Sequence, residues 1–390
     1  MKLKYLFILA LIASVTLNIL FIAVELQQRN TIRSYYEMLC VDSPTQTDIK
    51  SFHKYVVDGS TKILKEGIDI PQPQQLSWFK DHLITFFSKK DPGFNKNAFH
   101  FGENSFLLNA LIQEAQLSNN DSLLHFVCKI FDENVLILPP LNSEKTIDRA
   151  PYGTTAILLY KITKNEKYKN YADEEYKWLC TRDSTDVGII YYKRDKQAVE
   201  AIGYTCPFLM QYSEVFNEPS AKEMAINQIN KYCEHGMEER SGLPAVVWRR
   251  YPPYNSTSTH NWGRGNAWFS IGVLAVDSTL LSKHSADILK RYCKTLTEIY
   301  KRHGCFHQFL DDARTEIDMC AELPLIYFLY KKGLLKIRKQ DLLKYSRYMK
   351  EGIIYHSSGI ISHPGSPCRI VGSSNRLSQA YLLKLINEIQ

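Results

Sequence analysis

Residues 258–277 read STHNWGRGNAWFSIGVLAVD. The stretch opens with polar residues and then, from Asn266 onward, is apolar on nearly every side of a helix. A helix without a polar face is surrounded by protein rather than by water. The helix begins near Trp262, Arg264 and Trp268. The stretch therefore either packs into the hydrophobic core or lines the edge of a binding site.

An amphipathic helical pattern follows this apolar one, and the same alternation recurs along the chain. In each pair the first helix is apolar on nearly all sides, and the second carries its charges on one side. A buried helix covered from outside by an amphipathic one is the unit of a double ring of helices. We therefore expect an all-α fold, an (α/α)6 barrel with short β-hairpins in the loops at the cleft end. The pairs are 104–116 with 122–134, 154–163 with 168–180, 198–216 with 221–236, 266–281 with 286–303, and 319–335 with 339–354.

The N-terminus carries an apolar run without charge at residues 5–24. About 20 apolar residues, rising 1.5 Å each, match the ~30 Å hydrocarbon core of a bilayer. Lys2 and Lys4 precede the run, so the positive-inside rule places the rest of the chain outside the cytoplasm, in the periplasm or at the cell surface. A cleaved signal peptide is the alternative, but the run ends in AVELQQRN, which lacks a typical cleavage site. The predicted organisation is a cytoplasmic segment at 1–4, a transmembrane signal anchor at 5–26, a tether at 27–45 and the barrel domain at 46–390.

Composition excludes some classes of function. The net charge of +7 comes from 48 Lys and Arg against 41 Asp and Glu, and no dense basic block stands in the body of the chain. Nucleic acid is therefore not an expected partner. The nine cysteines include no C-x-x-C pair, so the spacing typical of a zinc site is missing.

The loops before the apolar helices carry polar and aromatic residues. Consecutive inner helices of such a ring run parallel, so these loops gather at one end. Asp148 and Glu200, on different loops, are candidates for a general acid and a water-activating base. Arg264 is a candidate clamp for a carboxylate, and Trp262 a candidate platform for a sugar ring.

Each of these residues also has a plainer interpretation. Asp148 and Glu200 are acids near helix N-termini, where the dipole favours negative charge. Trp268 lies inside the helix and is a candidate core residue. Arg264 could hold a neighbouring loop, and His260 could cap the helix or contact Trp262 and do nothing more. The functional interpretation depends on the fact that all of them are expected at one rim.

The motif W-G-R-G-N-x-W at the start of an inner helix resembles the signature of glycoside hydrolase family 105, the unsaturated rhamnogalacturonyl hydrolases. The related family 88, the unsaturated glucuronyl hydrolases, has Gln where Asn266 stands. Three further segments resemble these families in the same order along the chain, so that the likeness covers most of residues 100–390. They are IDRAPYGTTAILLYKITKNEKY, GIIYYKRDKQAVEAIGYTCPFLMQY and HQFLDDARTEIDMCAELPLIYFLYKKGLL.

The resemblance implies an (α/α)6 barrel acting on oligosaccharides that end in a 4,5-unsaturated uronic acid. In these families one Asp protonates the sugar double bond and activates a water that adds at C5, and the hemiketal then releases the aglycone. By position, the first family aspartate falls on Asp148, and Glu200 replaces the second, the usual acid/base. Tyr192 stands where the family places a histidine, and the neighbouring Lys193 matches a family lysine. No metal or organic cofactor is implied.

Three hypotheses follow. The first is an exported, membrane-anchored glycoside hydrolase that hydrates the double bond of an acidic, unsaturated uronyl oligosaccharide. The second is a catalytically impaired glycan-binding protein on the same scaffold, acting in surface-polysaccharide assembly or export. The third is another (α/α)6 enzyme, a polysaccharide lyase or an epimerase, using His303, His307 or Tyr191 as a base. For the first, the predicted catalytic residues are Glu200 and Asp148, and the predicted substrate-binding residues are Arg264, Trp262, Asn266, Trp268, His260, Lys193 and Tyr192.

Overall fold

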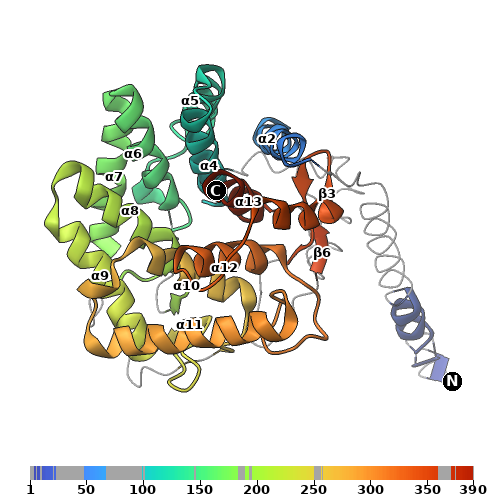
Figure 1. Cartoon of the computed structure of the whole chain (residues 1–390). Coiled ribbons are helices and arrows are strands. Elements are labelled where there is room, and N and C mark those ends of the chain that lie inside the picture. Colours follow the sequence, from blue (N-terminus) through green and yellow to red (C-terminus); the bar gives the residue numbers. More distant parts are fainter. Residues whose placement is uncertain are drawn as a thin grey trace.

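The five helices that the sequence marks as apolar lie in a closed inner ring, which α13 (Arg376–Glu388) completes (Figure 1). Each contacts the next in chain order, and the last returns to contact the first. In the described part of the chain the ring consists of α4 (Glu103–Leu117), α6 (Pro151–Thr163), α8 (Glu200–Phe216), α10 (Gly263–Ala275), α12 (Met319–Lys331) and α13 (Arg376–Glu388).

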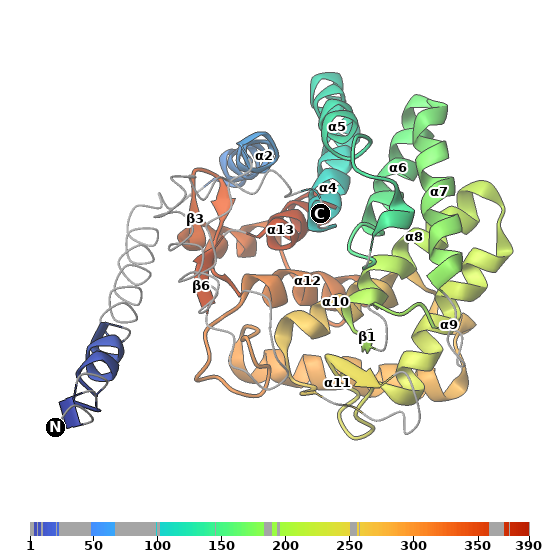
Figure 2. The same ribbon diagram turned by 180° about the vertical axis from the view of Figure 1, so that it is seen from behind.

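A second set of helices covers this ring from outside, as the turned view in Figure 2 also shows. The helices α5, α7 and α9 each pack on the inner helix that precedes them, and α2 packs on α13. Tyr292 of α11 meets Phe269 of α10 edge to face, with ring centroids 5.3 Å apart. The result is the (α/α)6 barrel that the paired patterns predict. The outer set is α2 (Ile49–Glu66), α5 (Asp121–Asn134), α7 (Glu166–Arg182), α9 (Pro219–His235), α11 (Lys283–His303) and the 3-10 helix η4 (Lys339–Tyr348), with short 3-10 turns at η2 (Leu141–Ser143) and η3 (Ser278–Leu280).

The computed structural model describes most, but not all, of the chain. The described residues are 4, 5, 7, 8, 11–20, 22, 48–66, 99, 102–144, 146–182, 189–192, 196–249, 256, 258–358, 370–373 and 375–389.

Short left-handed turns connect the first three inner helices to their outer partners. Asn119, Lys164 and Asn217 have φ angles of 48°, 55° and 55°, in the left-handed region that ends a helix. The next helix then begins at once: Asn120 caps α5 by accepting a hydrogen bond from the backbone N–H of Leu123 at 3.0 Å. These turns coincide with the polar breaks in the sequence, which explains why the first pairs were predictable.

The structure corrects the prediction at the last two pairs. Residues 339–348 form a 3-10 helix instead of the predicted amphipathic α-helix. The sixth pair combines α13 with α2, and the paired patterns did not predict it because its two members lie at opposite ends of the chain.

The strands also differ from the predicted hairpins at the cleft end. β1 (Lys196–Ala198) and β2 (Val247–Arg249) pair antiparallel with each other, so they join two different loops. A true hairpin forms between β3 (Met349–Lys350) and β4 (Ile353–Ile354), where Glu351 and Gly352 turn with φ angles of 51° and 78°. β5 (Ser357–Ser358) pairs with β6 (Ile370–Ser373).

The structure does not support the predicted transmembrane helix. Among the described residues, none of the helices combines the length and the apolar character needed to span a membrane. The prediction of a transmembrane segment at 5–26 is therefore wrong, and the predicted tether at 27–45 lies outside the described residues.

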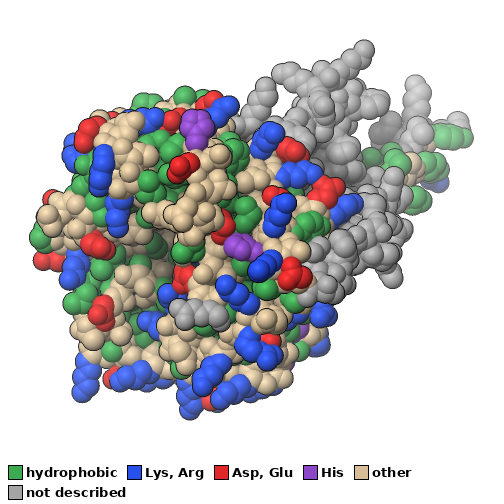
Figure 3. Space-filling view, turned by 45° about the horizontal axis from the view of Figure 1, so that its top comes forward, with side chains coloured by type: hydrophobic (Ala, Val, Ile, Leu, Met, Phe, Trp, Pro, Cys, Tyr) green, Lys and Arg blue, Asp and Glu red, His purple; other side chains and the backbone are tan. Residues whose placement is uncertain are grey.

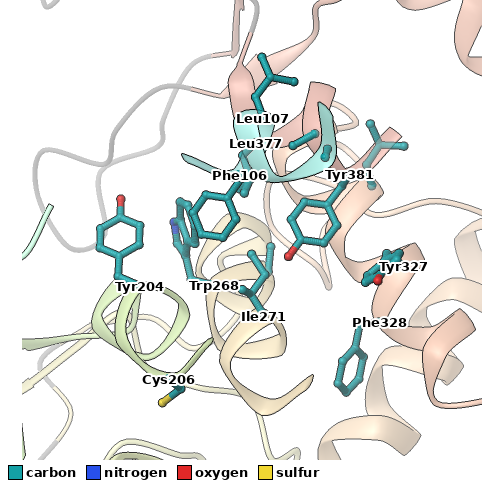
Figure 4. Close-up of a cluster of buried hydrophobic side chains, with 14 of the residues drawn as sticks. Phe106, Leu107, Tyr204, Cys206, Trp268, Ile271, Tyr327, Phe328, Leu377 and Tyr381 are labelled. Carbon is teal, nitrogen blue, oxygen red and sulfur yellow. The ribbon is translucent and has the colours of Figure 1, made fainter. Parts of the chain in front are cut away.

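The core of the ring is aromatic around Trp268. Figure 4 shows this side chain between Tyr204 of α8 and Phe106 of α4, with ring centroids 4.9 Å and 5.6 Å away. The backbones of α8 and α10 approach closely, since a Cβ atom at Gly203 would lie 2.7 Å from the carbonyl oxygen of Trp268. Glycine is required at this crossing because any side chain would separate the two helices.

The surface carries charges of both signs. On the face in Figure 3, Lys and Arg side chains are interspersed with Asp and Glu. Acidic and basic side chains therefore alternate over this face.

Candidate active site

The first turns of the inner helices meet at one end of the ring, called the mouth below. Glu103 begins α4 and Glu200 begins α8, while Arg264 lies in the first turn of α10. A Cβ atom at Gly102 would lie 2.4 Å from the carbonyl oxygen of Asp148, so the starts of α4 and α6 touch. Helix N-termini carry partial positive charge, which stabilises carboxylates placed there.

Glu200 is positioned by the sheet between the two loops. Ala198 ends β1, and the backbone N–H of Val199 donates to the carbonyl oxygen of Val246 at 3.0 Å, immediately before α8 begins. The Oε2 atom of Glu200 is buried and has no hydrogen-bond partner among the described residues. Burial raises the pKa of this carboxyl to about 7, and the negative charges of Asp148 and Glu103 act in the same direction, against the attraction of Arg264.

Asp148 lies in a different environment because two hydroxyl groups hold it. Tyr192 donates to its Oδ1 atom and Thr146 to its Oδ2 atom, each at 2.5 Å. Burial raises the pKa of Asp148, while both hydrogen bonds counteract the rise. The mouth therefore contains two acids in different surroundings: Glu200, whose pKa burial raises to about 7, and Asp148, whose raised pKa is counteracted by two hydrogen bonds. Such a difference between two acids is what acid–base chemistry requires.

Arg264 is paired within the protein. It forms an ion pair with Glu103, a residue that the sequence interpretation missed. The guanidinium also lies over the ring of Trp268, 5.9 Å from its centroid. Glu103 shares one sequence signal with Glu200, because both are acids at the first position of an apolar helix.

The remaining residues of the 258–277 stretch belong to the packing. Trp262 and Trp268 are 2% and 1% exposed, so neither offers a face to a sugar in this structure. Asn266 is fully buried, and its side chain donates to the carbonyl oxygens of His260 and Trp262 at 3.1 Å and 2.8 Å. The stretch is thus mainly a core element that holds Arg264 at the mouth. His260 contributes its backbone, and burial lowers the pKa of its ring.

Among the other predicted residues, Tyr192 contacts Asp148, whereas Lys193 lies outside the described residues. Of the alternative bases, His303 has an Nε2 atom that is buried without a hydrogen-bond partner among the described residues, whereas the other two have contacts of their own. His307 interacts with the carbonyl oxygen of Thr315 at 2.5 Å, and the ring of Tyr191 lies 4.8 Å from the guanidinium of Arg182. No group of three or more His, Cys, Asp or Glu side chains in the described residues is arranged to hold a metal ion.

Comparison with known proteins matches this arrangement to a family. The sequence profile described as Glycosyl Hydrolase Family 88 matches residues 81–335, about two thirds of the chain. The chain belongs to glycosyl hydrolase family 88. As a family 88 protein it is a glycoside hydrolase, and the predicted resemblance to families 105 and 88 is confirmed.

Solved structures share the fold of this family 88 protein. A possible member of the GH105 family from Salmonella enterica serovar Paratyphi A superposes with a TM-score of 0.66 at 14% identity, covering 88% of this chain and 95% of its own. A similar protein from Klebsiella pneumoniae gives 0.68 at 14% identity, with 88% and 94% covered. The unsaturated glucuronyl hydrolase of a Bacillus species, described as responsible for glycosaminoglycan degradation, gives 0.63 at 15% identity, with 87% and 96% covered. Among curated proteins, none matches the sequence significantly.

Proposed function

We propose that this glycoside hydrolase removes a terminal unsaturated uronyl sugar from an oligosaccharide, with Glu200 as the general acid/base and Asp148 as the carboxylate that positions the sugar. The proposal rests on the burial of the Glu200 carboxyl group and on its raised pKa. Its Oε2 atom is buried without a partner in the described residues, and its pKa is raised to about 7 by that burial. A carboxyl group with a pKa near the working pH can both donate and accept a proton.

The proposed reaction hydrates the double bond of the sugar. Protonated Glu200 gives its proton to C4, and the resulting carboxylate takes a proton from a water molecule whose oxygen bonds to C5. The hemiketal formed at C5 opens, and the rest of the oligosaccharide leaves as the aglycone. Glu200 is protonated again at the end of this step, so it acts as a true acid/base catalyst.

The family supports the choice of sugar. The Bacillus protein with the same fold is named an unsaturated glucuronyl hydrolase, and the family 88 profile covers the segment that contains Asp148, Glu200 and Arg264. A lyase mechanism would need a histidine or a readily deprotonated tyrosine as a base beside the acids of the mouth. Tyr192 is the tyrosine beside Asp148, and burial together with the nearby acids raises its pKa, which opposes that role.

The test follows the ultraviolet absorbance of the unsaturated sugar. Residues 46–390 would be incubated with mixed unsaturated uronyl oligosaccharides made by lyase digestion, beside the Glu200→Gln variant. We expect the absorbance to fall with the parent protein and to stay constant with the variant. Sugar binding without any fall in absorbance would instead identify a glycan-binding protein on a hydrolase scaffold.

A further inference from the structure

The pairing of Arg264 bears on which sugar the mouth accepts. Arg264 is the cation expected to clamp the carboxylate of a uronyl sugar, yet Glu103 already forms an ion pair with it. The side chains of Arg264 and Glu103 are only 7% and 17% exposed, so the pair is sheltered from water. Charges paired in such a place interact far more strongly than on the surface.

Both oxygens of Glu103 are engaged. One meets Arg264, and the other accepts a hydrogen bond from the side-chain amide of Asn375 at 2.9 Å. Asn375 is itself fixed, because its Oδ1 atom accepts from the backbone N–H of Leu377 at 2.7 Å and so caps α13. Three inner helices, α4, α10 and α13, therefore hold the Glu103 carboxylate in place.

A substrate carboxylate that approached Arg264 would be repelled by the negative charges already present at the mouth. The negative charge of Glu103 already acts on both Asp148 and Glu200, so the three acids lie within electrostatic reach of one another. A substrate carboxylate would either add a further negative charge beside them or displace Glu103. Displacement would leave a poorly compensated charge in a sheltered site, which is strongly unfavourable.

We propose that Glu103 is a specificity-determining residue: it takes the place of a substrate carboxylate on Arg264, so the sugar bound there is an uncharged derivative of a uronyl group, such as its ester. This inference rests on the proposed function, since it assigns the substrate of the same site. An esterified unsaturated uronyl sugar keeps the double bond at which Glu200 acts, and it brings no charge to Arg264.

The experiment compares two substrates that differ only in this group, an unsaturated uronyl disaccharide and its methyl ester. Values of kcat/KM are measured for the parent protein, and calorimetry measures binding of both compounds to the parent protein and to Glu200→Gln. We expect the ester to be preferred by about tenfold or more, the ratio produced by one charged hydrogen-bonded contact. In Glu103→Gln, which removes the ion pair between Arg264 and Glu103, the preference should reverse toward the free acid.

Glu144 provides the matched control. It pairs with buried Arg149 at 2.9 Å, and its side chain is 19% exposed, close to the value for Glu103. Glu144→Gln should leave the ratio of ester to acid unchanged. If Glu103→Gln fails to fold, the ratio in the parent protein and in Asn375→Ala, where Glu103 is held less firmly, still tests the proposal.

The outcomes separate this inference from the proposed function. Hydrolysis with a clear preference for the free acid overturns the inference and leaves the proposed function standing. Binding that favours the ester, without hydrolysis of either compound, supports the inference and overturns the proposed hydrolysis. An equal loss for both substrates in Glu103→Gln and Glu144→Gln would make Glu103 a structural residue only.

Discussion

Tyr192 donates a hydrogen bond from its hydroxyl group to Oδ1 of Asp148 at 2.5 Å, and this contact joins the loop before α8 to the start of α6. The two residues come from different hairpins of the barrel, 44 positions apart in sequence. Asp148 thereby keeps a fixed orientation beside Glu200. In the proposed reaction, Tyr192 acts through Asp148, as a positioning residue.

We expect Tyr192→Phe to lower kcat/KM by about tenfold, because a carboxylate that loses one hydrogen bond is less precisely oriented. The hydrogen bond also lowers the pKa of Asp148, so its loss should raise that pKa and move the acidic limb of the pH–rate profile to higher pH. Tyr191→Phe is the control, since it keeps the ring that Arg182 contacts. An unshifted acidic limb in Tyr192→Phe would contradict the assigned role of Asp148.

Two substitutions of Glu200 distinguish the effect of losing its carboxyl group from the effect of shortening its side chain. Glu200→Gln removes the proton donor and should reduce kcat by at least about 10²-fold, with binding retained. Glu200→Asp keeps the acid but withdraws it by about 1 Å, a misplacement that can cost ~10²-fold. Single-turnover measurements with both variants check this. Full activity in Glu200→Gln would remove Glu200 from the mechanism.

The alkaline limb of the pH–rate profile should follow the loss of the proton from the Glu200 carboxyl group. The carboxyl must be protonated to donate, and its pKa is raised to about 7. We therefore expect kcat/KM to be constant just below pH 7 and to fall tenfold per pH unit above it. A profile that stays flat to pH 9 would be inconsistent with a protonated Glu200 in the free enzyme.

Glu200 should also make the folded protein less stable at high pH. Its pKa is about 7 in the folded state, against an ordinary value of 4.5, so the folded state binds the proton more tightly. The free energy of unfolding should then fall as pH rises from about 4.5 to 7. Glu200→Gln abolishes this ionisation and should be more stable than the parent protein at pH 8, by no more than about 3 kcal/mol. Urea denaturation at pH 8 and pH 4.5 measures the difference, which should nearly vanish at the lower pH.

Asn266 should matter for stability rather than for sugar binding. Its amide satisfies the carbonyl oxygens of His260 and Trp262 in a buried turn. Asn266→Ala should therefore destabilise the fold by about 2–3 kcal/mol. The control is Ser270→Ala on the same helix, which removes one local hydrogen bond and should cost about 1 kcal/mol. Equal melting temperatures for the two variants would contradict this role.

The sequence by itself determined the all-α class of the barrel and five of its inner helices. Residues around Phe208 and Phe269 are apolar on nearly all sides, and this pattern requires buried helices whatever the remaining contacts are. The polar breaks at residues 118–121, 164–167 and 217–220 marked the turns between inner and outer helices. The placement of Asp148 and Glu200 before parallel inner helices predicted that they share one end of the ring.

Only the tertiary structure decided which residues pair at that end. Arg264 and Glu103 are 161 positions apart, and they meet because α13 closes the ring beside α4. A sequence pattern shows which face of a helix is buried, but it does not show which side chain of a distant helix lies opposite. For the same reason the burial of Trp262 and the pairing of β1 with β2 followed from the fold alone. Local periodicity comes from neighbouring residues, whereas the chemistry of the mouth depends on contacts between helices that only ring closure brings together.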